Sequence, residues 1–189
     1  MFDLKSARHW AEELQREAIA PGMTAIDATR GNGGDTLRLC GLVGETGRVF
    51  AFDVQPQALA RTRERLEAAG LLARAELILA GHERVLEFVC EPVDAVVFNL
   101  GWLPGGDKSI TTRTETTLVA LDHCLSLLKP HGLLTLCAYP GHAEGAQELE
   151  RVREWARALD GRRFAAMERH YLNQASAPPV LLAVQRLRG

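Results

Sequence analysis

A glycine-rich loop near the start of the chain could hold a small ligand. Residues 27–35 read DATRGNGGD, with three glycines in four positions and an aspartate at each end. Glycines let a backbone pass close to a ligand, and a loop that leads into a helix presents unpaired amides to whatever lies in front of it. The sequence therefore predicts a small-molecule site at this loop.

Two common nucleotide-binding patterns do not fit the loop. A dinucleotide fingerprint, G-x-G-x-x-G, counted from Gly31 would need a glycine where Thr36 stands. A phosphate-binding loop would need the string G-x-x-x-x-G-K-[ST], which does not occur in the chain. The loop alone is a weak signal, so the residues that accompany it have to identify the ligand.

The loop is similar to the first motif of S-adenosylmethionine-dependent methyltransferases. In that motif an acidic residue at a strand end, here Asp27, precedes a G-x-G segment, here Gly31, Asn32 and Gly33. Thr29 stands where the motif often has its first glycine. Because this cofactor carries no phosphate, its loop need only let the backbone approach the methionyl and ribose parts. The resemblance implies that the cofactor lies against these residues.

Two further loops carry polar groups suited to such a cofactor. Asp53 ends the run RVFAFD and Gln55 comes two residues later; a carboxylate at Asp53 could accept hydrogen bonds from both ribose hydroxyls. A competing interpretation of Asp53 is a cap for the helix predicted from Pro56. Gly81 and His82 follow the next run, AELILA, where methyltransferases bind the adenine edge. We expect these residues to contact the cofactor.

The segment FNLGWLPGGDK, residues 98–108, follows the fourth apolar run. Methyltransferases that act on amino groups often have [N/D]-P-P-[Y/F/W] here, where an amide oxygen accepts a hydrogen bond from the target amine and the aromatic ring stacks on the substrate. Asn99 and Trp102 match the two ends of that string, whereas other residues replace its prolines. Asp107 and Lys108 could line the mouth of the site, with Lys108 contacting a phosphate. The competing interpretation is a buried turn.

These loops need a scaffold that brings strand ends together. Short apolar runs alternate with helical patterns, and near-continuous apolar strands are typical of a parallel sheet covered on both faces. We predict a doubly wound, mostly parallel, seven-stranded α/β sheet whose ligands bind at the carboxyl ends of the strands. The predicted strands are 24–28, 48–53, 75–80, 94–100, 132–139, 163–172 and 179–187, and the predicted helices are 3–19, 35–43, 56–70, 83–90, 113–129 and 145–161.

Size and composition suit one domain over residues 1–189. Of the 189 residues, 47% are hydrophobic and 24% are charged, enough to bury one sizeable core. Residues 1–22 would form an N-terminal helix and lead-in, which we interpret as a packing helix at one edge, and residues 23–189 the core. The net charge of -2 gives no global electrostatic argument for nucleic acid.

The cysteines and the N-terminus bear on location. None of the four cysteines stands in a metal-ligand spacing, so no metal is expected and all four are interpreted as reduced core thiols: Cys40, Cys90, Cys124 and Cys137. The N-terminus is charged, and no stretch of 18 apolar residues occurs in the chain. These features predict a cytoplasmic protein without a membrane partner.

Together, the motifs DATRGNGGDT, FDVQ, GHE, FNLGWLPGGDKSITT, YPGH and NQASAPP resemble the putative rRNA methylase family. The resemblance covers nearly the whole chain, in the same motif order. It implies a Rossmann-like class I methyltransferase fold and S-adenosyl-L-methionine as cofactor. It also implies tRNA as substrate, because the better understood members turn wobble 5-aminomethyl-2-thiouridine into 5-methylaminomethyl-2-thiouridine. Arg30 and Gly34 depart from the family pattern; a cation at Arg30 should be unfavourable beside a cationic cofactor unless it points outward.

Methyl transfer to an amine sets further requirements. The reaction is an in-line displacement from a sulfonium, so the amine must be neutral and aligned with the methyl carbon. Asn99 is the predicted acceptor that orients the amine, and His142 in YPGH is the first candidate for the proton acceptor. Tyr139, Tyr171, Asn173 and Gln174 are expected to close over the uridine.

The predicted partner is the anticodon stem-loop of a tRNA, held by a homodimer. Arg151, Arg153 and Arg157 fall on a predicted helix and could face the RNA, although a solvated helix face is the competing interpretation. Two other functions stay open: a methyltransferase acting on rRNA or a small amine, and a non-enzymatic nucleotide-binding module. Asn99 and Trp102 argue against the second, because a scaffold has no need of polar groups at that strand end.

Overall fold

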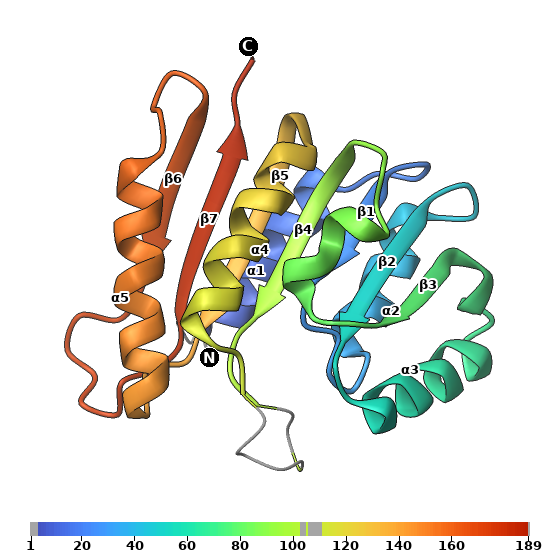
Figure 1. The fold of residues 1–189 in the computed structure, drawn as a ribbon, viewed down its shortest axis with the longest axis horizontal. Coiled ribbons are helices and arrows are strands. Elements are labelled where there is room, and N and C mark those ends of the chain that lie inside the picture. Colours follow the sequence, from blue (N-terminus) through green and yellow to red (C-terminus); the bar gives the residue numbers. More distant parts are fainter. Residues whose placement is uncertain (1–3, 103–104, 106–110, 189) are drawn as a thin grey trace.

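A computed structural model describes residues 4–102, 105 and 111–188 (Figure 1). The predicted site residues Asp107 and Lys108 lie outside the described residues. The elements, with η marking short 3-10 helices, are α1 (Ala7–Ala18), β1 (Thr24–Asp27), α2 (Gly34–Val43), β2 (Arg48–Asp53), α3 (Pro56–Ala68), η1 (Leu72–Arg74), β3 (Ala75–Leu79), η2 (His82–Glu87), β4 (Val93–Asn99), α4 (Thr114–Leu127), β5 (Leu128–Ala138), α5 (Ala143–Ala158), β6 (Phe164–Arg169) and β7 (Val180–Arg186).

The strands form one sheet of seven, in the order β3-β2-β1-β4-β5-β7-β6. Each neighbouring pair among β1 to β5 is parallel, and β7 is antiparallel to both β5 and β6. The strand order reverses between β1 and β4, which creates the switch point where α/β sheets of this kind bind ligands. The sheet has the topology class that the sequence predicts.

Helices cover both faces of the sheet. In Figure 1, α4 and α5 lie in front of it and α1 and α2 lie behind. Alternate side chains of β4 pack in two different apolar clusters: Val96 and Phe98 belong to one, and Ala95 and Val97 to the other. Because side chains alternate across a strand, a strand buried on both faces must be apolar at nearly every position.

Several boundaries differ from the predicted ones. The helix predicted at 83–90 is the 3-10 helix η2, and α1 begins only at Ala7, where Ser6 accepts a hydrogen bond from a backbone N–H of the first turn. The helix predicted to reach residue 129 ends at Leu127, and β5 follows directly. Pro130 explains this boundary, because proline disfavours helical backbone in the residue before it.

Two expectations concern accessibility. Cys40, Cys124 and Cys137 are buried thiols, but Cys90 is exposed in the turn between η2 and β4, so the prediction of a core position is wrong for Cys90. Within the residues described, no helix is both long and apolar enough to cross a membrane.

Candidate active site

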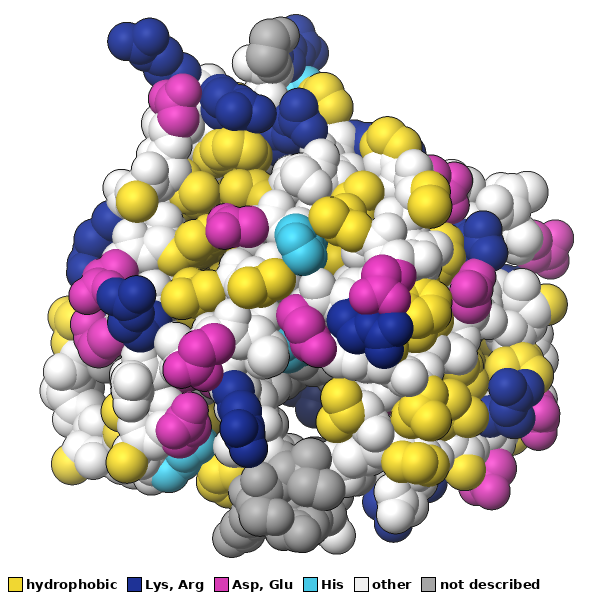
Figure 2. Space-filling view, viewed as in Figure 1, with side chains coloured by type: hydrophobic (Ala, Val, Ile, Leu, Met, Phe, Trp, Pro, Cys, Tyr) yellow, Lys and Arg dark blue, Asp and Glu magenta, His cyan; other side chains and the backbone are white. Residues whose placement is uncertain are grey.

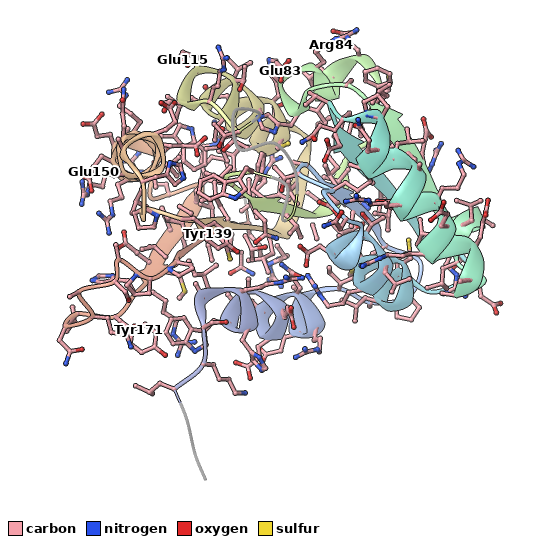
Figure 3. The ribbon with its side chains drawn as sticks, turned by 90° about the horizontal axis from the view of Figure 1, so that it is seen from below. Glu83, Arg84, Glu115, Tyr139, Glu150 and Tyr171 are labelled. Carbon is pink, nitrogen blue, oxygen red and sulfur yellow. The ribbon has the colours of Figure 1, made fainter. Side chains whose placement is uncertain are left out.

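A cavity of about 820 Å³ lies at the carboxyl ends of the parallel strands. The loops after β1 to β5 line it, and Arg8 of α1 contributes one side. Figure 3 looks onto this end of the sheet, with Tyr139 near the centre and Tyr171 at the periphery beside α1. A volume of this size suits a nucleoside-sized ligand together with a reacting group.

Ten of the predicted site residues line this cavity, and they come from five separate loops. They are Gly31 and Asn32 after β1, Asp53 and Gln55 after β2, Gly81 and His82 after β3, Asn99 and Trp102 after β4, and Tyr139 and His142 after β5. These residues are far apart in the sequence, so the parallel sheet is what brings them together.

The other predicted site residues that the structure describes do not line the cavity. Gly33 has a φ of 79°, and a Cβ there would come within 2.7 Å of Thr62 Oγ1, so glycine is needed for loop shape. Tyr171, Asn173 and Gln174 lie between β6 and β7. Asn173 and Gln174 are exposed, and Tyr171 and Gln174 line a separate cavity of about 280 Å³. The geometry does not support their predicted contacts with ligand.

Asp27 lies beneath the first loop rather than in the cavity lining. Its carboxylate is fully buried, accepts a hydrogen bond from Thr36 Oγ1 at 2.6 Å and faces the backbone N–H of Thr29 at 3.3 Å. Burial, reinforced by the nearby charge of Asp35, raises the pKa of Asp27 to about 7. The residue shapes the loop from below, and a direct cofactor contact would need the loop to shift.

Asp53 ties the loop after β1 to the loop after β2. Its Oδ2 accepts a hydrogen bond from the Gly31 N–H at 2.9 Å, and its Oδ1 accepts one from the Gln55 N–H at 2.8 Å. The N-cap residue of α3 is Gln55, so the competing interpretation of Asp53 as the helix cap is wrong. The carboxylate is fixed in the cavity wall by backbone groups on both sides.

His82 is a buried, neutral acceptor at the third strand end. Its Nδ1 lies 3.3 Å from the carbonyl oxygen of Ala28, and the ring packs edge-on against Phe98. Burial lowers the pKa of His82, so the ring is neutral with its proton on Nδ1. Nε2 is then an acceptor, and it has no hydrogen-bond partner among the residues that the structure describes.

Arg30 does not point outward. Only 2% of the residue is exposed, and Nη1 donates to the carbonyl oxygens of Ala51 at 3.0 Å and Ile78 at 3.4 Å, at the ends of β2 and β3. Burial lowers the pKa of Arg30, while the charges of Asp53 and Asp27 oppose that shift. The guanidinium is therefore held under the loop by backbone carbonyls, but it still lines the cavity, and its Nε and Nη2 have no hydrogen-bond partner among the described residues. The predicted conflict with a cationic cofactor is only partly offset, by the charges of Asp53 and Asp27.

Asp35 fixes the orientation of the Asn99 side chain. Asn99 Nδ2 donates to Asp35 Oδ2 at 2.6 Å, and the Asn99 backbone N–H donates to Thr29 Oγ1 at 2.6 Å. Since a carboxylate only accepts hydrogen bonds, the amide must turn its NH₂ group toward it. Asn99 Oδ1 is left over, buried and without a partner among the described residues. Arg8 and Arg38 hold the other oxygen of Asp35.

Trp102 and His142 pack against each other in the cavity wall. Their ring centroids are 4.7 Å apart, and His142 Nδ1 accepts a hydrogen bond from the Gly145 N–H at 3.1 Å as the N-cap of α5. With Nδ1 accepting, a neutral ring carries its proton on Nε2 and can only donate from that atom. This arrangement argues against His142 as the proton acceptor and suits a role in holding Trp102.

Sequence reasoning missed several residues of the site. Arg8 and Asp35 line the cavity, and so does Thr112, which comes eleven residues after Gly101 in the sequence. The one available signal was the second aspartate of DATRGNGGD; nothing in the local pattern marks the others. Over the described residues, no group of three or more His, Cys, Asp or Glu side chains could hold a metal ion.

Comparison with known proteins places the chain in a family. The model of the family described as putative rRNA methylase matches residues 49–185. The chain belongs to the putative rRNA methylase family. It is an S-adenosylmethionine-dependent methyltransferase with a class I fold, and the predictions of family, fold, cofactor and enzyme class are confirmed.

Similar proteins include one sequence relative and two solved structures. The chloroplastic tRNA (mnm(5)s(2)U34)-methyltransferase of Arabidopsis thaliana is 37% identical, over 98% of this chain and 72% of the relative. A putative rRNA-methylase from Clostridium thermocellum is 39% identical with a TM-score of 0.96, over 98% of this chain and 100% of the other. A putative methyltransferase from Streptococcus mutans, solved in complex with SAH, is 35% identical with a TM-score of 0.89 and the same coverage.

Proposed function

We propose that this methyltransferase converts 5-aminomethyl-2-thiouridine at the tRNA wobble position into 5-methylaminomethyl-2-thiouridine. The observation that carries the proposal is the fixed amide of Asn99 at the end of β4, whose oxygen is an acceptor without a partner among the described residues. An acceptor in this position suits a target with N–H groups. The Arabidopsis relative, whose name specifies the mnm(5)s(2)U34 position of tRNA, supports this choice of amine.

The cofactor would occupy the part of the cavity formed by the loops after β1, β2 and β3. When bound, it supplies an electrophilic methyl group. Asp53 would accept hydrogen bonds from the ribose hydroxyls, since its carboxylate is already fixed by two backbone amides. His82 Nε2, an acceptor without a partner among described residues, would accept one from the adenine amino group. The residues present therefore fit S-adenosylmethionine.

The amine would lie between the loops after β4 and β5. Asn99 Oδ1 would accept a hydrogen bond from the neutral amine and direct its lone pair at the methyl carbon. A neutral amide stabilises the protonated, unreactive amine less than a carboxylate would. Trp102, held by His142, would stack on the uracil ring. Because His142 Nε2 carries a proton, the proton released by the amine passes to water.

The cavity mouth is better suited than α5 to contact RNA phosphates. Arg65 and Arg113 line the cavity, as does Arg8, which already pairs with Asp35 and Glu12. On α5, by contrast, Arg151 pairs with Glu154, and Arg153 pairs with Glu150 and Glu168. Figure 2 shows that acidic and basic side chains are mixed over the face that α4 and α5 cover. We therefore assign phosphate binding to the mouth, where cations would position the anticodon stem-loop.

A substrate panel tests the proposal. Purified protein and labelled S-adenosylmethionine are incubated with tRNA carrying 5-aminomethyl-2-thiouridine, the same tRNA lacking the amine, rRNA and the free nucleoside. We expect label only in the first sample. Label in rRNA or in the free nucleoside alone would favour the rRNA or small-amine alternative. No label in any sample would mean that this methyltransferase acts on none of these substrates, and the proposal would be wrong.

A further inference from the structure

A buried carboxylate on α5 is connected to the loop that carries Trp102. Glu148 is only 2% exposed and does not line the cavity. Its Oε2 accepts a hydrogen bond from Thr112 Oγ1 at 2.9 Å, and its Oε1 accepts one from Thr117 Oγ1 at 2.6 Å. Burial raises the pKa of the Glu148 carboxyl, and the two hydroxyl donors oppose that shift.

Thr112 passes this anchoring on to the start of the loop. Its Oγ1 accepts a hydrogen bond from the Gly101 N–H at 2.8 Å, and its own N–H donates to the Gly101 carbonyl at 3.1 Å. Trp102 and Thr111 form an isolated antiparallel bridge beside these bonds. These contacts join residues 101–102 to residues 111–112, starting two residues beyond Asn99.

We propose that Glu148 is a positioning residue for methyl transfer, acting through Thr112 on Gly101 and Trp102. A hydroxyl has one hydrogen to donate, so its donation to Glu148 leaves the Thr112 lone pairs for the Gly101 N–H. The same helix places His142 against Trp102. α5 thus acts on the backbone next to Trp102 through Glu148 and Thr112, and on the Trp102 ring through its N-cap residue His142. This inference rests on the proposed binding of the amine beside Asn99.

A purely structural role is the alternative, in which Glu148 only joins α5 to α4. The two threonines separate these roles, because each donates one hydroxyl to the same carboxylate but only Thr112 contacts Gly101. Thr112→Val and Thr117→Val are therefore a matched pair: each removes one hydroxyl and keeps the shape of the side chain. A structural role predicts similar effects for the two, and a positioning role predicts different ones.

Kinetics of methyl transfer provide the first readout. Thr112→Val should lower kcat on the order of 10- to 100-fold, the cost of a misplaced reacting group, without changing the affinity for S-adenosylhomocysteine. Thr112→Ser should restore the rate because it keeps the hydroxyl. Glu148→Ala should behave like Thr112→Val, and Glu148→Gln should recover much of the rate, since an amide can pair with both hydroxyls. Thr117→Val should lower the melting temperature and leave kcat nearly unchanged.

Fluorescence of Trp102 provides a readout that does not depend on the substrate. The chain has three tryptophans, so Trp10→Phe with Trp155→Phe leaves Trp102 as the sole emitter. In that background, Thr112→Val and Glu148→Ala should increase quenching by acrylamide, whereas Thr117→Val should not. Unchanged quenching in Thr112→Val, or an equal change in Thr117→Val, would overturn the inference. If the wild type fails to methylate the amine, the proposed function is wrong, and quenching still decides the role of Glu148.

Discussion

The proposed chemistry depends on the side-chain amide of Asn99. Its NH₂ group is committed to Asp35, so only Oδ1 is left to position an amine. Asn99→Ala should keep the affinity for S-adenosylhomocysteine and lower kcat by about 10²- to 10³-fold, the usual effect of removing one such contact. Calorimetry and single-turnover transfer measure the two quantities. Asn173→Ala, outside the cavity, is the matched control, and equal rates for both variants would contradict the assignment.

Asp27 gives the protein a pH-dependent stability. Its pKa is about 7 in the folded chain, against 3.8 as the ordinary value. Between these values the folded state holds a proton that the unfolded state has lost, so the contribution of Asp27 to the free energy of unfolding is greatest below pH 3.8 and falls until about pH 7.

Asp27→Asn should remove this dependence. The variant should match the wild type near pH 4 and exceed its melting temperature at pH 8, because the amide is neutral throughout. Thermal denaturation across this range measures the difference. A variant that is less stable than the wild type at pH 8 would show that the ionised carboxylate stabilises the fold.

The sequence predicts the positions of site residues at strand ends. It does not predict the contacts of residues that support the site from outside the cavity. Asp53 and Asn99 follow apolar runs, and the parallel-sheet pattern alone brings such positions to one edge. The buried position of Asp27 beneath its loop depends on the turn geometry of residues 29–33, which composition does not reveal. Glu148 lies 36 residues from Thr112, and no local pattern pairs two residues at that separation.

At the scale of elements, the carboxyl ends of the parallel strands carry the cavity, and their amino ends carry contacts that stabilise the fold. Asp53, at the carboxyl end of β2, accepts two backbone hydrogen bonds in the cavity wall. Asp94, near the amino end of β4, accepts hydrogen bonds from the Thr24 N–H at 2.9 Å and Lys129 Nζ at 2.8 Å. The two aspartates each accept two hydrogen bonds, at opposite ends of the parallel strands.

This pair separates binding from stability. Asp53→Ala should weaken binding of S-adenosylhomocysteine by roughly 1.5–3 kcal/mol, the range for hydrogen bonds to a charged group. Asp94→Ala should lower the melting temperature by a similar amount to Asp53→Ala without affecting that binding. Calorimetry and thermal denaturation of both variants provide the comparison. Equal losses of affinity in the two variants would mean that Asp53 acts only through the fold.

The N-terminal helix α1 does more than the predicted packing. Buried Gln15 donates to Thr135 Oγ1 of β5 at 2.7 Å, and its Oε1 accepts from Arg38, which in turn pairs with Asp35. The helical pattern of the sequence predicted the element and its covering position. It could not predict this polar connection to Asn99, because the partners come from three separate elements.

At the scale of the whole molecule, we expect two copies of the chain to bind one tRNA. A chain of 189 residues offers a small surface for an anticodon stem-loop, and a C₂ pair would extend it. Light scattering should give the mass of a dimer over a range of protein concentrations. A monomer at every concentration, with full activity on tRNA, would end this prediction.

The mass of the wobble nucleoside in living cells tests the central claim most directly. Nucleosides from tRNA are compared by mass spectrometry in cells with the protein, without it, and without it but supplied with either the wild type or Asn99→Ala. The account predicts that 5-aminomethyl-2-thiouridine accumulates when the protein is absent, that the wild type restores 5-methylaminomethyl-2-thiouridine, and that Asn99→Ala does not. Unchanged wobble nucleosides in cells without the protein, with a methyl group lost from rRNA instead, would contradict it.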